Sequence, residues 1–363
     1  MPEPDFVMAP DTITTTIALE PAQNALHSLA LIHKVQHMSG LDDWVTRTAA
    51  ALSPEQAQRH GVVFEGLFYL IQPQRSFPSF PAYLDDLAAQ PAEALRDRLL
   101  KAYHNMACET GQMAGDELPD LDVILASEAA YLQYLYDLGP FTINEEIERS
   151  TYHLLIDPPA MRRYVVDHLH MMWQEFVAPE WARVEPMLQE AVEAFATQDY
   201  AGLTPPEIAR RITGHDYGDD WTHKLLSVAD RVIFVPSAHI GPYMGKYLAG
   251  KTLWLLFGAR LPEGVRRPAS SALTRSELLV RLNALADDTR LRILALVAEH
   301  GELCAQDIIT KLDLSQSAAS RHLKQLSATG YLFERRQENA KCYSLNPDRI
   351  EDTCEGLRQF VQA

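Results

Sequence analysis

Hydrophobic and polar residues follow a helical spacing along most of the chain. Apolar side chains recur every three or four positions in Leu95–Asn105, Pro159–Phe176 and Val184–Ala196, as on one buried face of a helix. In the segment GLTPPEIARRITG, Thr204 offers an N-cap, Pro205 suits the first helical turn, and a glycine ends the pattern. The first part of the chain is therefore predicted to be mainly helical.

Two segments of this first part have the composition of strands. Thr12–Leu19 is rich in β-branched residues, and Arg231–Val235 is a short apolar run that we expect to end at Pro236. The fold class predicted is mainly α with minor β: a large helical N-terminal domain with a little sheet, followed by a distinct C-terminal domain. The stretch LPEGVRRPASSA interrupts the periodic pattern, so we predict an N-terminal domain over 1–262, a linker over 263–272 and a C-terminal domain over 273–363.

The C-terminal domain opens with two predicted helices. Leu278, Leu282 and Leu285 share one helix face, and the polar run Asp287-Asp288-Thr289 offers N-caps for a second helix, LRILALVAEH, which Gly301 ends.

A third helix is expected at about Ala305–Leu312, and a fourth over Gln316–Thr329 after a turn at Asp313-Leu314. Ser315 is a good N-cap for the fourth helix, and Gly330 stops it. Two short helices separated by so brief a turn must cross steeply, which is helix-turn-helix geometry.

The fourth helix is expected to bury Ala319, Leu323 and Leu326. Its opposite side carries small polar and basic residues that suit base edges and phosphates: Gln316, Ser317, Ser320, Arg321 and Lys324.

After this helix, YLFERRQ and KCYSL alternate around Glu338-Asn339-Ala340 and predict a β-hairpin, the wing. Its Arg335, Arg336 and Lys341 are expected to meet the DNA backbone. A last amphipathic helix is predicted from about Pro347 to Val361.

The order of these blocks resembles the ArsR/SmtB winged-helix regulators over almost all of residues 275–361. The similarity rests on LNALADDTRLRILALV, ELCAQDI, LSQSAASRHLKQLSATGYL and a wing ending in CYSLN. It implies a homodimer with the first and last helices of the domain at the interface, and repression from an operator, which we expect to be an inverted repeat in double-stranded DNA. It also implies that the following residues lie at or near the DNA: Ser315, Gln316, Ser317, Ser320, Arg321 and His322.

The chain departs from the metal-sensing members of that family. Cys304 matches the first thiolate of their ELCxC block, but Gln306 replaces the second, and the last helix has no His. Zinc and arsenic sites need three or four soft or imidazole ligands. We therefore predict no metal site and no cofactor, and interpret Cys304 as a small buried residue; a metal-responsive sensor is the less favoured alternative.

Charge and cysteine content add to this picture. The net charge is −17, but residues from Ser271 onward hold 12 Lys+Arg against 13 Asp+Glu, whereas the first 270 residues hold 20 against 36. The acidity therefore belongs to the N-terminal domain and does not argue against DNA binding. The four Cys lack CxxC spacing, the start of the chain has no signal-peptide pattern, and apolar runs such as Thr252–Ala259 are too short for a membrane span. We expect a cytoplasmic protein with reduced thiols and no membrane partner.

The N-terminal domain holds all five Trp and twelve of the fourteen Tyr, so it is a reasonable place for a small-molecule effector pocket. Candidate effector residues are His170, Trp173, Trp221 and His223, although each of them fits an ordinary core position as well. An alternative is a dimerisation or docking module that binds no ligand.

A less favoured alternative is an enzyme fused to the DNA-binding domain. The segment GHDYGDDWTH groups three Asp with two His, but polar loops of this kind more often cap helices. No P-loop, GxSxG, HExxH or GxGxxG pattern occurs, so no catalytic residue is predicted. The sequence predicts a non-enzymatic, dimeric transcriptional repressor that its N-terminal domain modulates through a small molecule or a partner.

Overall fold

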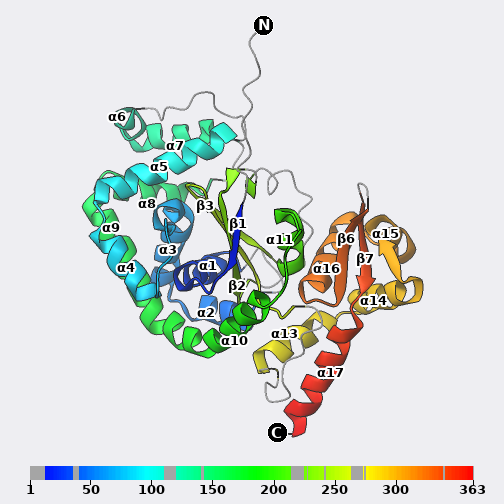
Figure 1. Ribbon diagram of the computed structural model, residues 1–363. Helices are drawn as coiled ribbons and strands as arrows, with labels where there is room; N and C mark the ends of the chain where they lie inside the picture. The colour runs from blue at the N-terminus through cyan, green and yellow to red at the C-terminus, as the bar shows by residue number, and fades with distance from the viewer. Residues whose placement is uncertain are drawn as a thin grey trace. The chain divides into compact units, whose positions relative to one another are not determined.

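The computed structural model describes residues 13–35, 41–109, 120–139, 143–213, 225–226, 228–240, 243–262, 273, 275–337 and 340–362. Helices predominate, and the strands form two small sheets (Figure 1). This confirms the predicted fold class. The chain packs as two compact units: one holds Glu20–Lys34 and Thr48–Arg183, and the other holds Met1–Leu19, Val35–Arg47 and Val184–Ala363. The predicted linker, 263–272, lies outside the described residues, so the predicted domain boundaries stay a prediction.

All regular secondary structure among the described residues of the first unit is helical. It contains α1 (Pro21–His33), α3 (Pro54–Gly61), a π-helical turn η1 (Val62–Gly66), a 3₁₀ turn η2 (Phe68–Ile71), α4 (Phe80–Ala89), α5 (Ala92–Glu109), α6 (Leu121–Ile124), α7 (Glu128–Asp137), α8 (Glu145–Leu155), α9 (Pro158–Met172) and a second π-helical turn η3 (Trp173–Val177). Side-chain caps fix several of the helix starts, and at α3, Ser53 and Gln56 form a reciprocal capping box. The helices predicted from Leu95 and Pro159 correspond to α5 and to α9 with η3.

The second unit contains a four-stranded sheet in the order β1-β2-β4-β3. Its strands are β1 (Thr14–Ile17), β2 (Arg231–Ser237), β3 (Gly245–Ala249) and β4 (Thr252–Gly258). β2 pairs in parallel with both β1 and β4, and β3 is antiparallel to β4. This unit also contains α11 (Pro205–Thr213), the first part of α2 (Asp43–Ala51) and the last part of α10 (Ala178–Ala196). Helices α10 and α11 confirm the helices predicted there.

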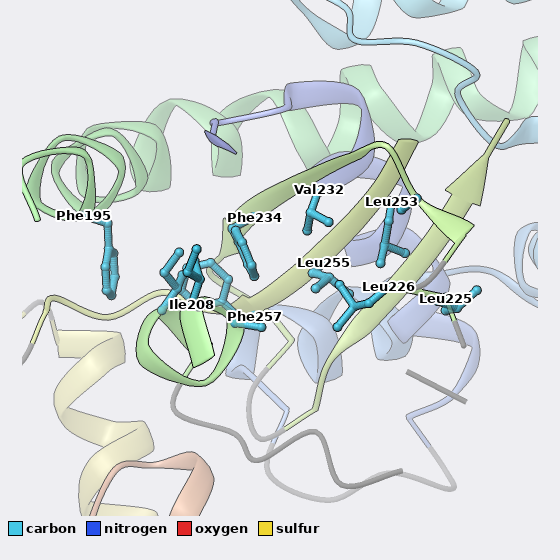
Figure 2. Close-up of a cluster of buried hydrophobic side chains, with 12 residues drawn as sticks. Phe195, Ile208, Leu225, Leu226, Val232, Phe234, Leu253, Leu255 and Phe257 are labelled. Carbon is cyan, nitrogen blue, oxygen red and sulfur yellow. The ribbon is translucent and has the colours of Figure 1, made fainter. Parts of the chain in front are cut away.

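One face of this sheet packs on helices (Figure 2). Val232 and Phe234 of β2 lie beside Leu253 and Leu255 of β4, as the register requires. Together with Phe195 of α10 and residues of α11 they form a fully buried cluster. A strand that is buried on both faces reads as a continuous apolar run without alternation, and this is why the sequence did not reveal β4.

The prediction that Pro236 ends β2 is wrong, because the strand continues to Ser237. Successive residues of a parallel strand direct their backbone groups to opposite neighbours. The carbonyl of Phe234 accepts from Ala18, on the β1 side, whereas that of Ser237 accepts from Ala259, on the β4 side. Pro236 therefore turns its nitrogen toward the β1 side, where β1 has already ended at Ile17, and the missing N–H breaks no ladder bond.

The C-terminal part of the same unit comprises α13 (Arg275–Leu285), α14 (Asp288–His300), β5 (Glu302–Cys304), α15 (Ala305–Leu312), α16 (Gln316–Ala328), β6 (Leu332–Gln337), β7 (Ala340–Leu345) and α17 (Pro347–Gln362). The predicted helices and hairpin are all present, and β5 is an additional strand. Three strands form a sheet in the order β5-β7-β6. Ile293, Ile308, Leu323 and Tyr331 contribute to its core. No helix within the described ranges is long and apolar enough to cross a membrane.

Candidate nucleic-acid interface

A tight turn joins α15 to α16. Asp313 ends α15 in the left-handed conformation, with φ of 52°, which Asp tolerates better than most residues. The amide of Leu314 then donates to the carbonyl of Ile309. Ser315 begins α16 because its hydroxyl accepts a hydrogen bond from the amide of Ala318 at 3.2 Å. The sequence predicted this turn and this cap.

The two sides of α16 differ in chemistry. Ala319, Leu323 and Leu326 are at most 1% exposed and anchor the helix in the core. The predicted DNA-facing residues at the start of the helix and along its outer side are exposed: Ser315, Gln316, Ser317, Ser320, Arg321 and Lys324. The periodicity of the helix therefore presents one continuous face of small polar and basic side chains.

The start of α16 is suited to an anion. The hydroxyl of Ser315 lies 3.2 Å from that of Ser317, so both sit over the first turn, where backbone N–H groups have no helical partner. Such a helix N-terminus stabilises negative charge, and phosphate oxygens commonly accept from these groups in protein–DNA contacts.

Basic side chains extend this surface. Arg321 is exposed and makes no ion pair with a carboxylate in the described part of the chain. Desolvation and the nearby ammonium of Lys341 lower the pKa of Lys324, so the second cation of α16 and a cation of the wing lie close enough to repel each other. A phosphate placed between them would relieve that repulsion.

The wing is the β6–β7 hairpin. In the register of this hairpin, Arg335 is opposite Cys342 and Arg336 is opposite Lys341. The side chains of both arginines lie outside what the structure describes. Lys341 is exposed and forms an ion pair of 2.6 Å with Glu334. Sequence reasoning missed this acidic partner, which DNA would have to displace.

His322 differs from the other predicted DNA-contact residues because it is only 9% exposed. Its Nδ1 lies 3.6 Å from Asp287, the N-cap of α14. Desolvation by burial lowers the pKa of His322 despite the opposing effect of Asp287, so at neutral pH the ring is uncharged and does not add to the basic surface.

Arg290 is a residue whose role sequence reasoning missed. Its guanidinium is 9% exposed and donates to the carbonyls of Ala284 (2.6 Å) and Asn283 (2.7 Å), at the C-terminal end of α13, and to Oε1 of Gln325 in α16 (3.1 Å). One side chain thus connects three helices and satisfies carbonyls that a helix end leaves unpaired. Through its hydrogen bond to Gln325, Arg290 holds α16 in position relative to α13 and α14.

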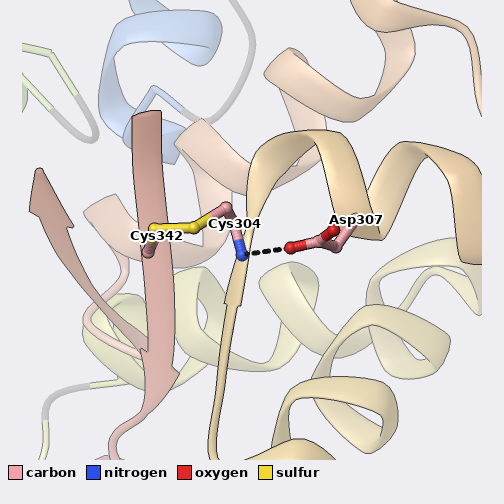
Figure 3. Close-up of a disulfide and its surroundings, with 3 residues drawn as sticks. All are labelled: Cys304, Asp307 and Cys342. Atoms are coloured by element: carbon pink, nitrogen blue, oxygen red, sulfur yellow. Dashed lines mark hydrogen bonds between the residues drawn. A yellow bond between two sulfur atoms is a disulfide. The ribbon is translucent and has the colours of Figure 1, made fainter. Parts of the chain in front are cut away.

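The structure contradicts the expectation of reduced cysteines without partners. Cys304, at the end of β5, and Cys342, on β7, form a disulfide (Figure 3). Cys304 is only partly buried, and Cys354 of α17 is exposed and free. The sequence separation of 38 residues concealed the pair, because only the antiparallel register of β5 and β7 brings the two thiols together.

Two of the four predicted effector residues, His170 and Trp173, lie in the described part of the chain. Trp221 and His223 lie outside the described residues. His170 lies in the last turn of α9 and is partly exposed, and the Trp173 ring packs on Phe80 with 5.2 Å between centroids. These two residues do not line the hollow of about 340 Å³ in the helical unit, whose wall includes Arg75, Phe77 and Arg98.

The same unit buries titratable groups that sequence reasoning did not single out. Nε2 of His60 donates to the carbonyl of Leu29 at 2.9 Å, so Nδ1 accepts from Nε2 of His168 at 3.0 Å. Burial lowers the pKa of His60 to about 4 and that of His168 to about 3. Glu148 accepts from the hydroxyl of Tyr131 at 2.7 Å, and burial raises its pKa to about 7.

Two helices joined by a short turn, a polar and basic outer face on the second helix, and a two-stranded wing define a winged helix-turn-helix protein.

Comparisons with known proteins agree with this class. A family model described as "Bacterial regulatory protein, arsR family" matches residues 287–332. The arsenic resistance transcriptional regulators ArsR1 and ArsR2 of Pseudomonas putida are 47% and 41% identical over 64 and 80 residues; these alignments cover 18% and 22% of this chain and 50% and 70% of the relatives. The arsenical resistance operon repressor of Escherichia coli K12 is 49% identical over 63 residues, 17% of this chain and 54% of that protein.

The chain belongs to the arsR family of bacterial regulatory proteins, as the order of its sequence blocks indicated. The chain spans only about half of the length of ArsR1 and of the Escherichia coli repressor. Most of this chain lies outside each alignment.

Proposed function

We propose that this protein regulates transcription by binding double-stranded DNA, with α16 in the major groove and the wing on the adjacent backbone. The observation that carries the proposal is the outer face of α16, where Gln316, Ser320 and Arg321 are exposed beside the capped helix start. Side chains of these types donate to base edges and phosphates. Lys324 and Lys341 add positive charge on the same side.

The proposed active form is a homodimer that contacts its partner through α13 and α17. These two helices pack against each other, yet large apolar side chains remain exposed on them: Leu279 (40%), Leu357 (39%), Phe360 (49%) and Val361 (75%). Exposed apolar side chains grouped in this way mark protein contacts more often than solvent-facing surface. A two-fold dimer would read an inverted repeat with its half-sites about one DNA turn apart.

Repression is the proposed outcome of binding, since one of the three named relatives is an operon repressor and the other two are resistance regulators. A dimer seated on an operator blocks access to the promoter. Binding to an operator is tested by selection of binding sites from a random duplex library by the full-length protein, followed by footprinting. An enriched inverted repeat with two protected half-sites supports the proposal, whereas a library that stays random after selection contradicts it.

We further propose that the N-terminal part modulates DNA binding through a small molecule. Its support is the concentration of aromatic residues there and the hollow of about 340 Å³, which falls in the size range of ligand sites. A ligand that binds only the folded protein raises its melting temperature by mass action. A thermal-shift screen with no hit, together with a partner protein recovered on the N-terminal part, would favour the docking alternative.

The proposed role is regulatory and not catalytic, and the winged helix is proposed to hold no metal. The named relatives are transcriptional regulators. Within the described part of the winged helix, Cys304 and Cys342 have no third His, Cys, Asp or Glu ligand close enough to complete a metal site.

A further inference from the structure

The disulfide occupies a particular place in the winged helix. Cys304 is the last residue of β5 and also the N-cap of α15, the first helix of the helix-turn-helix pair. Cys342 follows Lys341 on the wing strand β7. The bond therefore joins the start of the helix-turn-helix motif directly to the wing (Figure 3).

The proximity of the two sulfurs comes from the backbone. β5 and β7 are antiparallel, and Cys304 is directly opposite Cys342, with their Cα atoms 3.7 Å apart. Side chains of directly opposed residues are near neighbours on one face of a sheet. The register thus keeps the two thiols adjacent when the bond is reduced, as a reversible dithiol requires.

The two cysteines differ in access and surroundings. Cys304 is partly exposed, whereas Cys342 is fully buried. The N-terminal end of α15 favours negative charge at Cys304, although the carboxylate of Asp307, which accepts from the Cys304 amide at 3.3 Å, opposes it. Cys304 is accordingly the more accessible residue of the pair.

Closing the bond constrains the wing. The β5–β7 ladder has three residue pairs, and Cys304–Cys342 is the pair at its wing-tip end. Without the bond, that end is held by strand pairing and by the packing of β7 against α14 and α15. With the bond, the wing strand is fixed to the helix-turn-helix motif before DNA arrives. Constraining a binding element in its bound arrangement raises affinity by reducing the ordering cost of binding.

We infer that Cys304 and Cys342 form a reversible redox site that a hydroperoxide oxidises, and that the closed disulfide tightens DNA binding; this rests on the proposed function. The Cys304 thiolate attacks the O–O bond, giving a sulfenic acid while the other oxygen leaves as an alcohol or water. The Cys342 sulfur then attacks the sulfenic sulfur, the S–S bond forms and water leaves. Two thiols lose two electrons and two protons, and the hydroperoxide is reduced. A small thiol reverses the step by exchange.

The experiment uses the full-length chain with Cys108→Ser and Cys354→Ser, so that only the pair remains. Protein treated with dithiothreitol or with hydrogen peroxide is alkylated and weighed by mass spectrometry. We expect two alkylated thiols after reduction and none after peroxide. Failure to form the intramolecular disulfide with peroxide overturns the inference without reference to DNA.

The second measurement is affinity for a duplex that the wild-type protein selects. We expect oxidised protein to bind roughly tenfold more tightly than reduced protein, and Cys342→Ser, added to the same background, to bind equally in both conditions. Equal affinity of the two redox forms, or weaker binding after oxidation, overturns the inference. If neither form binds any selected duplex, the proposed function itself fails. That outcome differs from equal binding by the two redox forms, which overturns only the redox inference.

Discussion

Replacement of Arg290 by Ala tests how the winged helix holds its recognition helix in place. The guanidinium donates to two carbonyls at the end of α13 and to Gln325 of α16, over distances of 2.6 to 3.1 Å, in a setting that is 9% exposed. Hydrogen bonds to a charged group contribute about 1.5–3 kcal/mol each. The three are not additive, and water can reach some of the freed groups. We expect a loss of about 3 kcal/mol, within the range for breaking a buried charged contact.

Amide hydrogen exchange of the full-length chain measures this loss locally. All five Trp lie in the N-terminal part, so tryptophan fluorescence would not report on the winged helix. A loss of about 3 kcal/mol raises the opening equilibrium more than a hundredfold, and we expect that acceleration in peptides from α13, α14 and α16. Arg292→Ala is the matched control, since Arg292 is exposed on the same helix. Exchange in Arg290→Ala as slow as in this control would refute the reasoning.

Three further predictions follow from other parts of the structure. Burial holds the pKa values of His60 and His168 near 4 and 3, below their value of about 6.5 in the unfolded chain. The contribution of this neutral pair to the free energy of unfolding is therefore fully present above pH 6.5 and is lost as the pH drops toward 4. His168→Gln should flatten this loss in urea unfolding followed by tryptophan fluorescence; an equally steep curve would count against the histidine pair as its cause. Phe360→Asp should convert a dimer to a monomer in sedimentation experiments, and a variant that stays dimeric argues against the α13–α17 interface. Gly330 has φ of 79°, so Gly330→Ala should cost about 1–2 kcal/mol and Gly330→Asn less, by hydrogen exchange; equal stability of Gly330→Ala and wild type would refute this.

Local sequence signals specified most of the winged helix. Ser315 and Asp287 cap helices in the structure as predicted, because a cap depends on residues three positions away. The left-handed turn at Asp313 and the glycine stops are equally local. Helical spacing likewise separated the buried and exposed sides of α16.

Pairings between distant residues could not be predicted in this way. Arg290 meets Gln325 35 positions away, and His60 meets His168 across 108 positions. Nothing in the periodicity of either segment indicates its partner. The Cys304–Cys342 pair is of the same kind, since it depends on a three-residue strand that is too short to give a pattern.

The sheet of the N-terminal part was only half predicted for a related reason. β1 and β2 are short runs of β-branched or apolar residues between turn signals, whereas β4 is an apolar run that is buried on both faces. Such a run has neither a strand period nor a helix period. Pro236 appeared to end β2 because the sequence does not show that the neighbouring strand has already ended.

The most direct test of the central claim is the affinity of Arg321→Ala for the selected duplex, beside Arg292→Ala as control. Both arginines are exposed in the winged helix, but Arg321 lies on α16 and Arg292 lies on α14, outside the proposed DNA and dimer surfaces. Losing a specific base contact costs about 1–3 kcal/mol, so Arg321→Ala should bind roughly 5- to 150-fold more weakly while Arg292→Ala binds like wild type. Undiminished binding by Arg321→Ala would contradict the assignment of α16 as the DNA-reading helix.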